Sequence, residues 1–108
     1  MAHYLLIESR DPFESVAVTQ QYDLAARLAR EGHSVTLFLV QNGVLPARRG
    51  ACSALLTRAC DAGVVLLADD FSLRERGIHA GTLAEGVRSA PLGVIVDRLA
   101  AGHKAMWH

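Results

Sequence analysis

Short apolar runs alternate with longer amphipathic segments along the chain, and this alternation restricts the fold more than any other feature. Five runs have the length and composition of strands: 3–9, 34–40, 64–68, 87–89 and 103–108. A strand, a helix and a second strand in succession form a βαβ unit, whose two strands pair in parallel. The order of segments therefore predicts a single α/β domain over residues 1–108, an open, parallel, five-stranded sheet with helices on both faces.

Capping signals set the limits of the predicted helices. Asp11, Pro12 and Glu14 suit the N-cap, the first helical position and the capping box of a helix that Gly32 ends. The other predicted helices span about 51–61, 69–77 and 91–101. The apolar stripes that we expect to face the sheet are Val18, Tyr22, Ala25 and Ala29; Cys52, Leu55, Leu56, Ala59 and Cys60; and Leu92, Ile95, Val96, Leu99 and Ala100.

Charge and hydropathy exclude two classes of partner. The 11 Lys and Arg residues balance the 11 Asp and Glu residues, whereas a protein that neutralises nucleic-acid phosphates normally has a basic excess. The longest apolar stretch, 62–68, is far shorter than the ~20 residues that span a bilayer. No basic segment followed by an apolar one opens the chain, so we expect a cytoplasmic protein that binds neither nucleic acid nor membrane.

Common cofactor and metal motifs are missing from the sequence. The loop after the first predicted strand has no glycine, so neither G-x-G-x-x-G nor a P-loop is present. There is no G-x-S-x-G elbow, no C-x-x-C and no H-x-x-x-H. We therefore expect no cofactor and no metal.

Polar residues gather where the predicted strands end, which is where open α/β sheets bind their ligands. The segments at these ends are 8–11, 41–42, 69–70 and Ser89. The candidate binding residues are Asp69, Asp70, Ser72, Arg74, Arg76, Arg10 and Asn42. A simpler role for the Asp69–Asp70 pair is to cap the short helix that follows it.

The order of elements, the segment FLVQNGV (38–44) and above all LLADDFSLRERGI (66–78) resemble the DsrE/DsrF-like proteins of sulfur relay systems. The resemblance runs over nearly the full chain and implies a DsrE-like fold with flavodoxin-like layering. In that family the loop after the third strand reads C-x-x-C-L-x-x-R-G-I or a one-cysteine version, and its cysteine carries sulfur as a persulfide. Leu73, Arg76, Gly77 and Ile78 match this pattern, whereas Asp69 and Ser72 stand at the two cysteine positions.

This departure removes the chemistry that the family uses, because a carboxylate or a hydroxyl cannot hold a sulfane sulfur. The resemblance thus predicts a protein related to intracellular sulfur relay that acts as a non-catalytic binding or scaffolding subunit. It also implies a trimer or hexamer, or an assembly with related DsrE/DsrF-like subunits, with a sulfur-carrier protein as a further partner. The 51% hydrophobic content also favours self-association, for which Trp107, Val44 and Leu45 are the interface candidates.

Two alternatives remain open. Cys52 follows Arg48 and Arg49 at the start of a predicted helix, where the helix dipole and these cations would lower its pKa, so it is a candidate relocated sulfur acceptor. Packing in the core is the simpler role for Cys52 and Cys60. The third reading is a flavodoxin-like regulatory domain that uses the Asp69–Asp70 loop for a partner or a metal.

Overall fold

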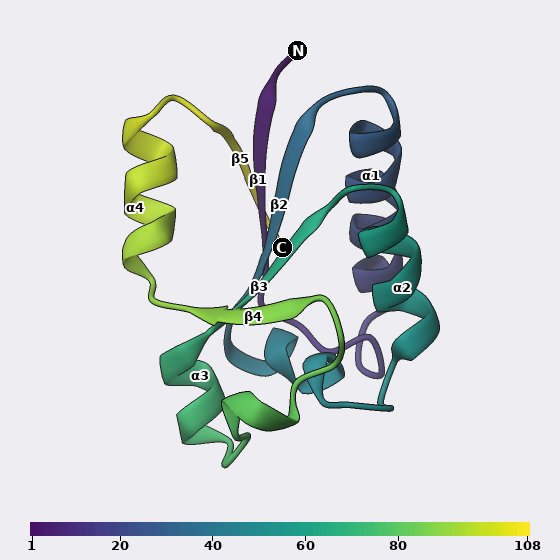
Figure 1. Cartoon of the computed structure of the whole chain (residues 1–108), viewed down its shortest axis with the longest axis vertical. Helices are drawn as coiled ribbons and strands as arrows, with labels where there is room; N and C mark the ends of the chain where they lie inside the picture. The colour runs from purple at the N-terminus through teal and green to yellow at the C-terminus, as the bar shows by residue number, and fades with distance from the viewer.

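A parallel β-sheet with helices packed against it makes up the structure, which is shown as a computed structural model in Figure 1. The structure describes residues 1–108, apart from the side chain of residue 53. The strands are β1 (His3–Glu8), β2 (Ser34–Leu39), β3 (Val65–Asp69), β4 (Val87–Ala90) and β5 (Lys104–Trp107). The α-helices are α1 (Val16–Arg30), α2 (Ser53–Asp61), α3 (Asp70–Glu75) and α4 (Gly93–Ala100), and the 3-10 helices are η1 (Gln41–Ala47) and η2 (Ala80–Thr82).

All five strands are parallel and lie in the order β4-β3-β2-β1-β5. The first four strands thus follow one another across the sheet, while β5 returns to the opposite edge and pairs with β1, with Tyr4 beside Lys104. The fold class and the edge position of the last strand are as the sequence predicts.

The strand order decides which face each helix covers. Right-handed crossovers that move across the sheet in one direction lie on one face, and a crossover that moves back lies on the other. Helices α1 and α2 make the first two crossovers and cover the same face, whereas α4 makes the return crossover and covers the opposite face (Figure 1). The expectation of helices on both faces is confirmed, with α4 alone on the second face.

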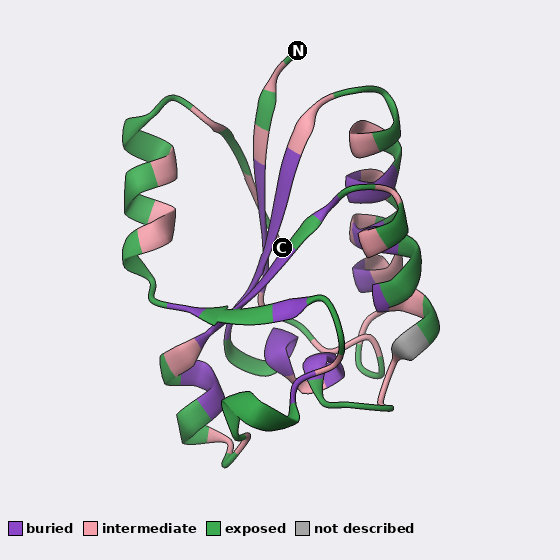
Figure 2. Cartoon of the chain, in the orientation of Figure 1, coloured by how far each residue is buried: buried purple, intermediate pink, exposed green. Residues whose placement is uncertain are grey.

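The central strands are mostly buried (Figure 2), and the side chains that alternate along them belong to one core under each face of the sheet. Under α1 and α2, Leu6, Leu37 and Leu66 pack with Val18 and Leu56. Under α4 the core is smaller and centres on Phe38, and its other buried members are Leu5, Ile7, Val40, Leu67 and Ala90. Tyr22 of the first core is buried, and its hydroxyl has no hydrogen-bond partner among the residues that the structure describes.

Helix α1 begins later than the capping signals predict. The Asp11 N–H does donate to Glu14 Oε1 (3.0 Å), and the Phe13 N–H donates to Asp11 Oδ1 (3.2 Å). These bonds close a separate turn, and the helix starts only at Val16. Phe13 and Val16 are both strongly exposed, so no apolar contact draws this turn into the helix.

Two more expectations were wrong in detail. In α4, Val94 and Ile95 contact the sheet, while Leu92, Val96 and Leu99 of the predicted stripe are exposed. Val44, expected at an interface, is fully buried in the larger core, because residues 41–47 form η1 rather than a simple turn.

Candidate functional site

The candidate site begins with Asp69, the last residue of β3 and the N-cap of α3. Its Oδ2 accepts hydrogen bonds from the N–H (3.0 Å) and the hydroxyl (2.6 Å) of Ser72. A carboxylate at an N-cap satisfies backbone N–H groups that have no partner within the helix. The capping role predicted for this carboxylate is therefore present, and Asp69 is only 2% exposed.

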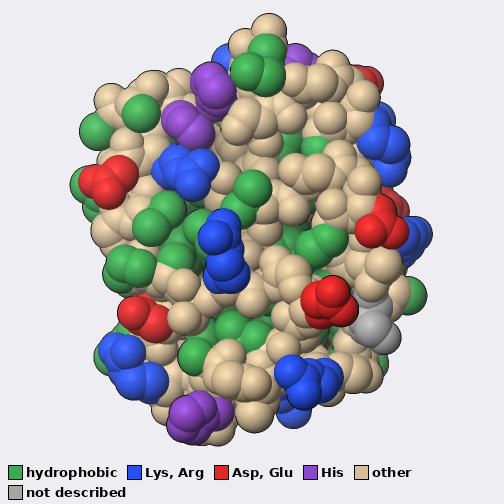
Figure 3. All heavy atoms as spheres, in the orientation of Figure 1, with side chains coloured by type: hydrophobic (Ala, Val, Ile, Leu, Met, Phe, Trp, Pro, Cys, Tyr) green, Lys and Arg blue, Asp and Glu red, His purple; other side chains and the backbone are tan. Residues whose placement is uncertain are grey.

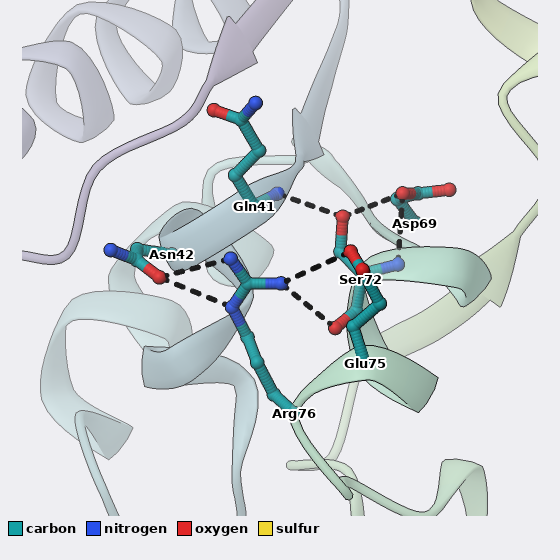
Figure 4. Close-up of polar contacts among 6 residues, drawn as sticks. All are labelled: Gln41, Asn42, Asp69, Ser72, Glu75 and Arg76. Carbon is teal, nitrogen blue, oxygen red and sulfur yellow. Dashed lines mark hydrogen bonds and ion pairs between the residues drawn. The ribbon is translucent and has the colours of Figure 1, made fainter.

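Ser72 extends this contact to the end of the neighbouring strand. Its Oγ accepts the Gln41 N–H at 2.8 Å, so the hydroxyl receives one hydrogen bond from η1 and donates one to Asp69. Gln41 has φ of 51°, a left-handed conformation that is unfavourable for a residue other than glycine. The serine at a family cysteine position thus holds the β2 and β3 ends together (Figure 4).

Arg76 makes a second connection between the same two segments. Its Nε and Nη2 both donate to Asn42 Oδ1, at 3.1 and 3.0 Å, and its Nη1 donates to the Ser72 carbonyl at 3.2 Å (Figure 4). Asn42, Asp69, Ser72 and Arg76, all predicted as binding residues, therefore form one network. Its hydrogen bonds give it a clear structural role, which is to fix α3 against η1.

An apolar groove of about 440 Å³ opens beside this network, between α3, α4 and the end of β5. Its apolar lining residues are Val40, Phe71, Leu92, Ile95, Val96 and Trp107, and Gln41, Asp69, Ser72 and Glu75 complete it. Phe71 is 54% and Trp107 is 65% exposed. Asp69 Oδ1 is buried and has no hydrogen-bond partner among the described side chains and backbone, and in Figure 4 it points away from Ser72. The groove can therefore bind apolar groups beside an unpaired carboxylate oxygen.

The other predicted binding residues lie outside the groove. Asp70 and Arg74 line a separate hollow beside Ser89, and the closest approach of their charged groups is 4.0 Å. Arg10 is exposed near the end of β1, where its backbone N–H donates to Glu8 Oε2 (3.1 Å). The structure thus separates the seven predicted residues into the network and these three outer positions.

Cys52 occupies the N-cap position of α2, in a hollow that it shares with Pro12, Phe13 and Thr19 and away from the groove. Burial raises the pKa of its thiol, Asp11 raises it further, and Arg48 only partly opposes them. The expected lowered pKa was therefore wrong: Arg48 does lower the pKa of this thiol, but burial and Asp11 outweigh it. Burial, Asp61 and Glu85 also raise the pKa of Cys60, so both thiols stay protonated near neutral pH.

Sequence reasoning missed a buried acid–histidine pair at the end of β1. Glu8 is fully buried, and both of its carboxylate oxygens lie 2.8 Å from His108 Nδ1. The alternation of side chains along β1 directs Glu8 toward one face of the sheet, but its partner, His108, follows β5. Only the return of β5 to the edge of β1 brings the two residues together. This pair fastens the end of β5 and lines no part of the groove.

The described residues offer neither a ready metal-binding cluster nor a membrane-spanning helix. Among the residues that the structure describes, no three His, Cys, Asp or Glu side chains are placed to hold a metal ion. Across that same part of the chain, no helix is both long and apolar enough to cross a membrane. Charged side chains on the face seen in Figure 3 are scattered, without a large area of one sign.

Comparison with known proteins identifies the fold. No protein-family model and no curated protein matches the chain. The chain is similar to the crystal structure of YchN from E. coli, with a TM-score of 0.85 and 19% identity over 98% of this chain and 99% of that one. It is also similar to two proteins described as of unknown function. MTH1491 from Methanobacterium thermoautotrophicum has a TM-score of 0.78 and 24% identity, and covers 97% of this chain and 96% of its own. BT1422 from Bacteroides thetaiotaomicron has a TM-score of 0.74 and 14% identity, and the match covers 98% of this chain and 95% of BT1422. The protein therefore has the YchN-like, or DsrE-like, fold.

Proposed function

We propose that this protein is a non-catalytic binding subunit of an assembly of DsrE-like chains that belongs to intracellular sulfur relay. The assembly is a homotrimer or homohexamer, or includes related DsrE/DsrF-like subunits, and it receives a sulfur-carrier protein as a partner. In this role the chain supplies a surface and a groove, and another subunit carries the sulfur.

The carboxylate of Asp69 is the observation that carries this proposal. Asp69 stands where the DsrE-like motif has its carrier cysteine, and two hydrogen bonds from Ser72 hold it there. None of the described residues that line the groove is a cysteine. A carrier needs a thiolate that attacks the terminal sulfur of a persulfide, forms a new S–S bond and releases the donor as a thiolate. A carboxylate cannot form that product.

The binding role is supported by exposed apolar side chains around the groove. Leu92, the N-cap residue of α4, is 48% exposed, and Val96 and Leu99 within the helix are 66% and 49% exposed. Leu92 and Val96 line the groove together with Phe71 and Trp107. Figure 3 shows hydrophobic groups at the surface over α4, at the left of the view. Large exposed apolar groups close together are typical of surfaces that bind another protein.

Incubation with a persulfide donor, followed by mass spectrometry of the intact protein, tests the missing chemistry. We expect wild-type protein to gain no sulfur that a reductant removes, whereas Asp69→Cys provides the positive control. A stoichiometric, reductant-sensitive gain in wild type that Cys52→Ser abolishes would instead establish Cys52 as a sulfur acceptor. Cys60→Ser is the matched control for the second thiol.

Light scattering at micromolar concentration tests the assembly. We expect the mass of an oligomer for wild type and that of a monomer for Val96→Asp, because the new carboxylate would be buried without a partner at the interface. Val16→Asp is the matched control, since Val16 is 81% exposed at the start of α1, on the opposite face. A monomeric wild type, or equal effects of the two substitutions, would contradict this part of the proposal.

A further inference from the structure

Three arginines surround a second hollow, which shares only Arg76 with the network described above and none of its lining with the groove. It has a volume of about 370 Å³ and is lined by Arg48, Arg49, Arg76, Gly77, Ile78 and Thr82. No carboxylate is among these residues. A cluster of three cations is unexpected in a chain whose formal net charge is zero.

The backbone that carries Arg48 and Arg49 is held in place. The Arg49 N–H donates to the Thr82 carbonyl at 3.1 Å, and Arg48 forms an isolated antiparallel bridge with Leu83. The Arg48 side chain is fixed as well, because its Nε donates to the Leu45 carbonyl at 2.9 Å. Its two Nη atoms have no acceptor among the described residues, so they can bind a ligand without losing an existing contact.

Arg76 is the most buried of the three, with 25% of its side chain exposed. Its bonds to Asn42 and to the Ser72 carbonyl fix the plane of the guanidinium group and leave N–H groups for a further acceptor. The nearest carboxylate, Glu75, is 4.0 Å away, which is a weak pairing. Arg49 is exposed and its side chain makes no hydrogen bond to the described residues, so it is free to close over an anion.

Three like charges that line one hollow, with no acid in its lining, repel one another, and an anion in the hollow would relieve this repulsion. The guanidinium group also has the geometry to donate two parallel hydrogen bonds to an oxyanion, and planar donors of this kind are typical of phosphate sites. Two of the three groups are already oriented, which lowers the entropy lost on binding. We propose that this hollow binds a tetrahedral oxyanion, a phosphate or sulfate group that is either free or carried on a small organic molecule.

A titration of the full chain with inorganic phosphate, monitored by NMR, tests this site. Chloride is the balancing anion that keeps the ionic strength constant. We expect saturable shifts confined to residues 48–49 and 76–82. We expect Arg48→Gln and Arg49→Gln each to weaken binding about tenfold, because each removes charge-assisted hydrogen bonds. Arg27→Gln is the matched control, since Arg27 is an exposed arginine of α1 that lines none of the hollows described here. Arg49→Gln removes no side-chain hydrogen bond to the described residues, and the variant should fold normally.

A parallel titration with glycerol phosphate distinguishes the two sources. Tighter binding of the ester than of inorganic phosphate would identify an organic phosphate, and equal or weaker binding would identify the free anion. Shifts that do not saturate, or that are the same in Arg49→Gln and Arg27→Gln, would show only an ionic-strength effect and would overturn the proposal. The result is independent of sulfur transfer and of oligomeric state.

Discussion

The two faces of the sheet are covered to different extents. One face is covered by α1 and α2, with 15 and 9 residues, and the other by α4 alone, with 8 residues. Five strands at a spacing of ~4.8 Å make a sheet more than about 20 Å wide, whereas a helix with its side chains is about 10 Å across. Two helices can cover such a sheet, and one cannot.

Topology explains this difference better than composition does. The first three crossovers move across the sheet in the same direction, and only the last one returns, so the second face receives a single long crossover. Apolar residues are present in α4, but Leu92, Val96 and Leu99 face away from the sheet. The comparison teaches that the incomplete cover of this face is a consequence of strand order.

The largest expected effect compares the two cores directly. Leu37 is fully buried under α1 and α2, so Leu37→Ala should lower the free energy of unfolding by about 3–5 kcal/mol. Ile95 is half-buried under α4, and Ile95→Ala should cost less than about 2 kcal/mol in the monomer. Urea denaturation of both variants measures the difference. Equal losses would mean that the faces are equally well packed.

A second test concerns the β3 end, where the groove meets the sheet. Asp69→Ala should cost about 1–2 kcal/mol, because it removes the cap of α3 and the Ser72 contacts. Asp69→Asn should cost less than about 1 kcal/mol, since asparagine also caps helices. The neighbouring Asp70→Ala is the control: Asp70 makes only an exposed ion pair with Arg74, and its loss should hardly change stability. A large effect of Asp70→Ala would contradict the division between inner and outer residues.

A third test asks whether the buried polar groups under the better-covered face all have hydrogen-bond partners. The Tyr22 hydroxyl is buried there and has no hydrogen-bond partner in the described part of the chain, and burial, followed by the Glu8 charge, raises its pKa. Tyr22→Phe should therefore raise the free energy of unfolding by about 1 kcal/mol, because it removes an unpaired polar atom. Tyr4→Phe, at a half-buried position, serves as the control and should be nearly neutral. A loss of stability in Tyr22→Phe would indicate an unrecognised partner for the hydroxyl.

The smallest expected effect is on the reactivity of two thiols, Cys52 at the N-cap of α2 and Cys60 within α2. Since the pKa values of Cys52 and Cys60 are raised, less thiolate is present at any given pH than in a free cysteine. Alkylation by iodoacetamide should be slower than for free cysteine at neutral pH and should accelerate as the pH rises into the alkaline range. The protonated thiols favour the folded state, so their contribution to stability is complete below the pKa of the unfolded chain and decreases above it. Rapid alkylation at neutral pH would contradict the raised pKa values.

The sequence predicted the elements that depend on local pattern. The βαβ order, the parallel sheet, the left-handed Gly32 after α1 and the Asp69 cap all follow from neighbouring residues. The residue at which α1 begins and the side of α4 that packs on the sheet do not follow from neighbouring residues. Each depends on which apolar groups find a surface to contact. For Leu92, Val96 and Leu99, helical spacing showed a stripe but did not show which side of the helix meets the sheet.

The site was predictable to a similar extent. Asp69, Ser72, Asn42 and Arg76 were identified because strand ends meet at one edge of a parallel sheet. The backbone donor at Gln41 was not, since its left-handed conformation gives no signal in the sequence. The three-arginine hollow was missed because Arg48 and Arg49 approach Arg76 only through the pairing of residues 48–49 with 82–83.

The pairing of β5 with β1 has a consequence for how this chain is made. Lys104 lies beside Tyr4, so during synthesis β1 has one open edge until the segment that contains β5, about 100 residues later, has left the ribosome. An unpaired edge of a strand as apolar as HYLLIE can recruit a strand from another molecule. Late closure of the sheet is therefore the step at which a nascent chain is most exposed to aggregation. The bonds of His108 to Glu8, Ile7 and Ser9 then fasten that edge once it has closed.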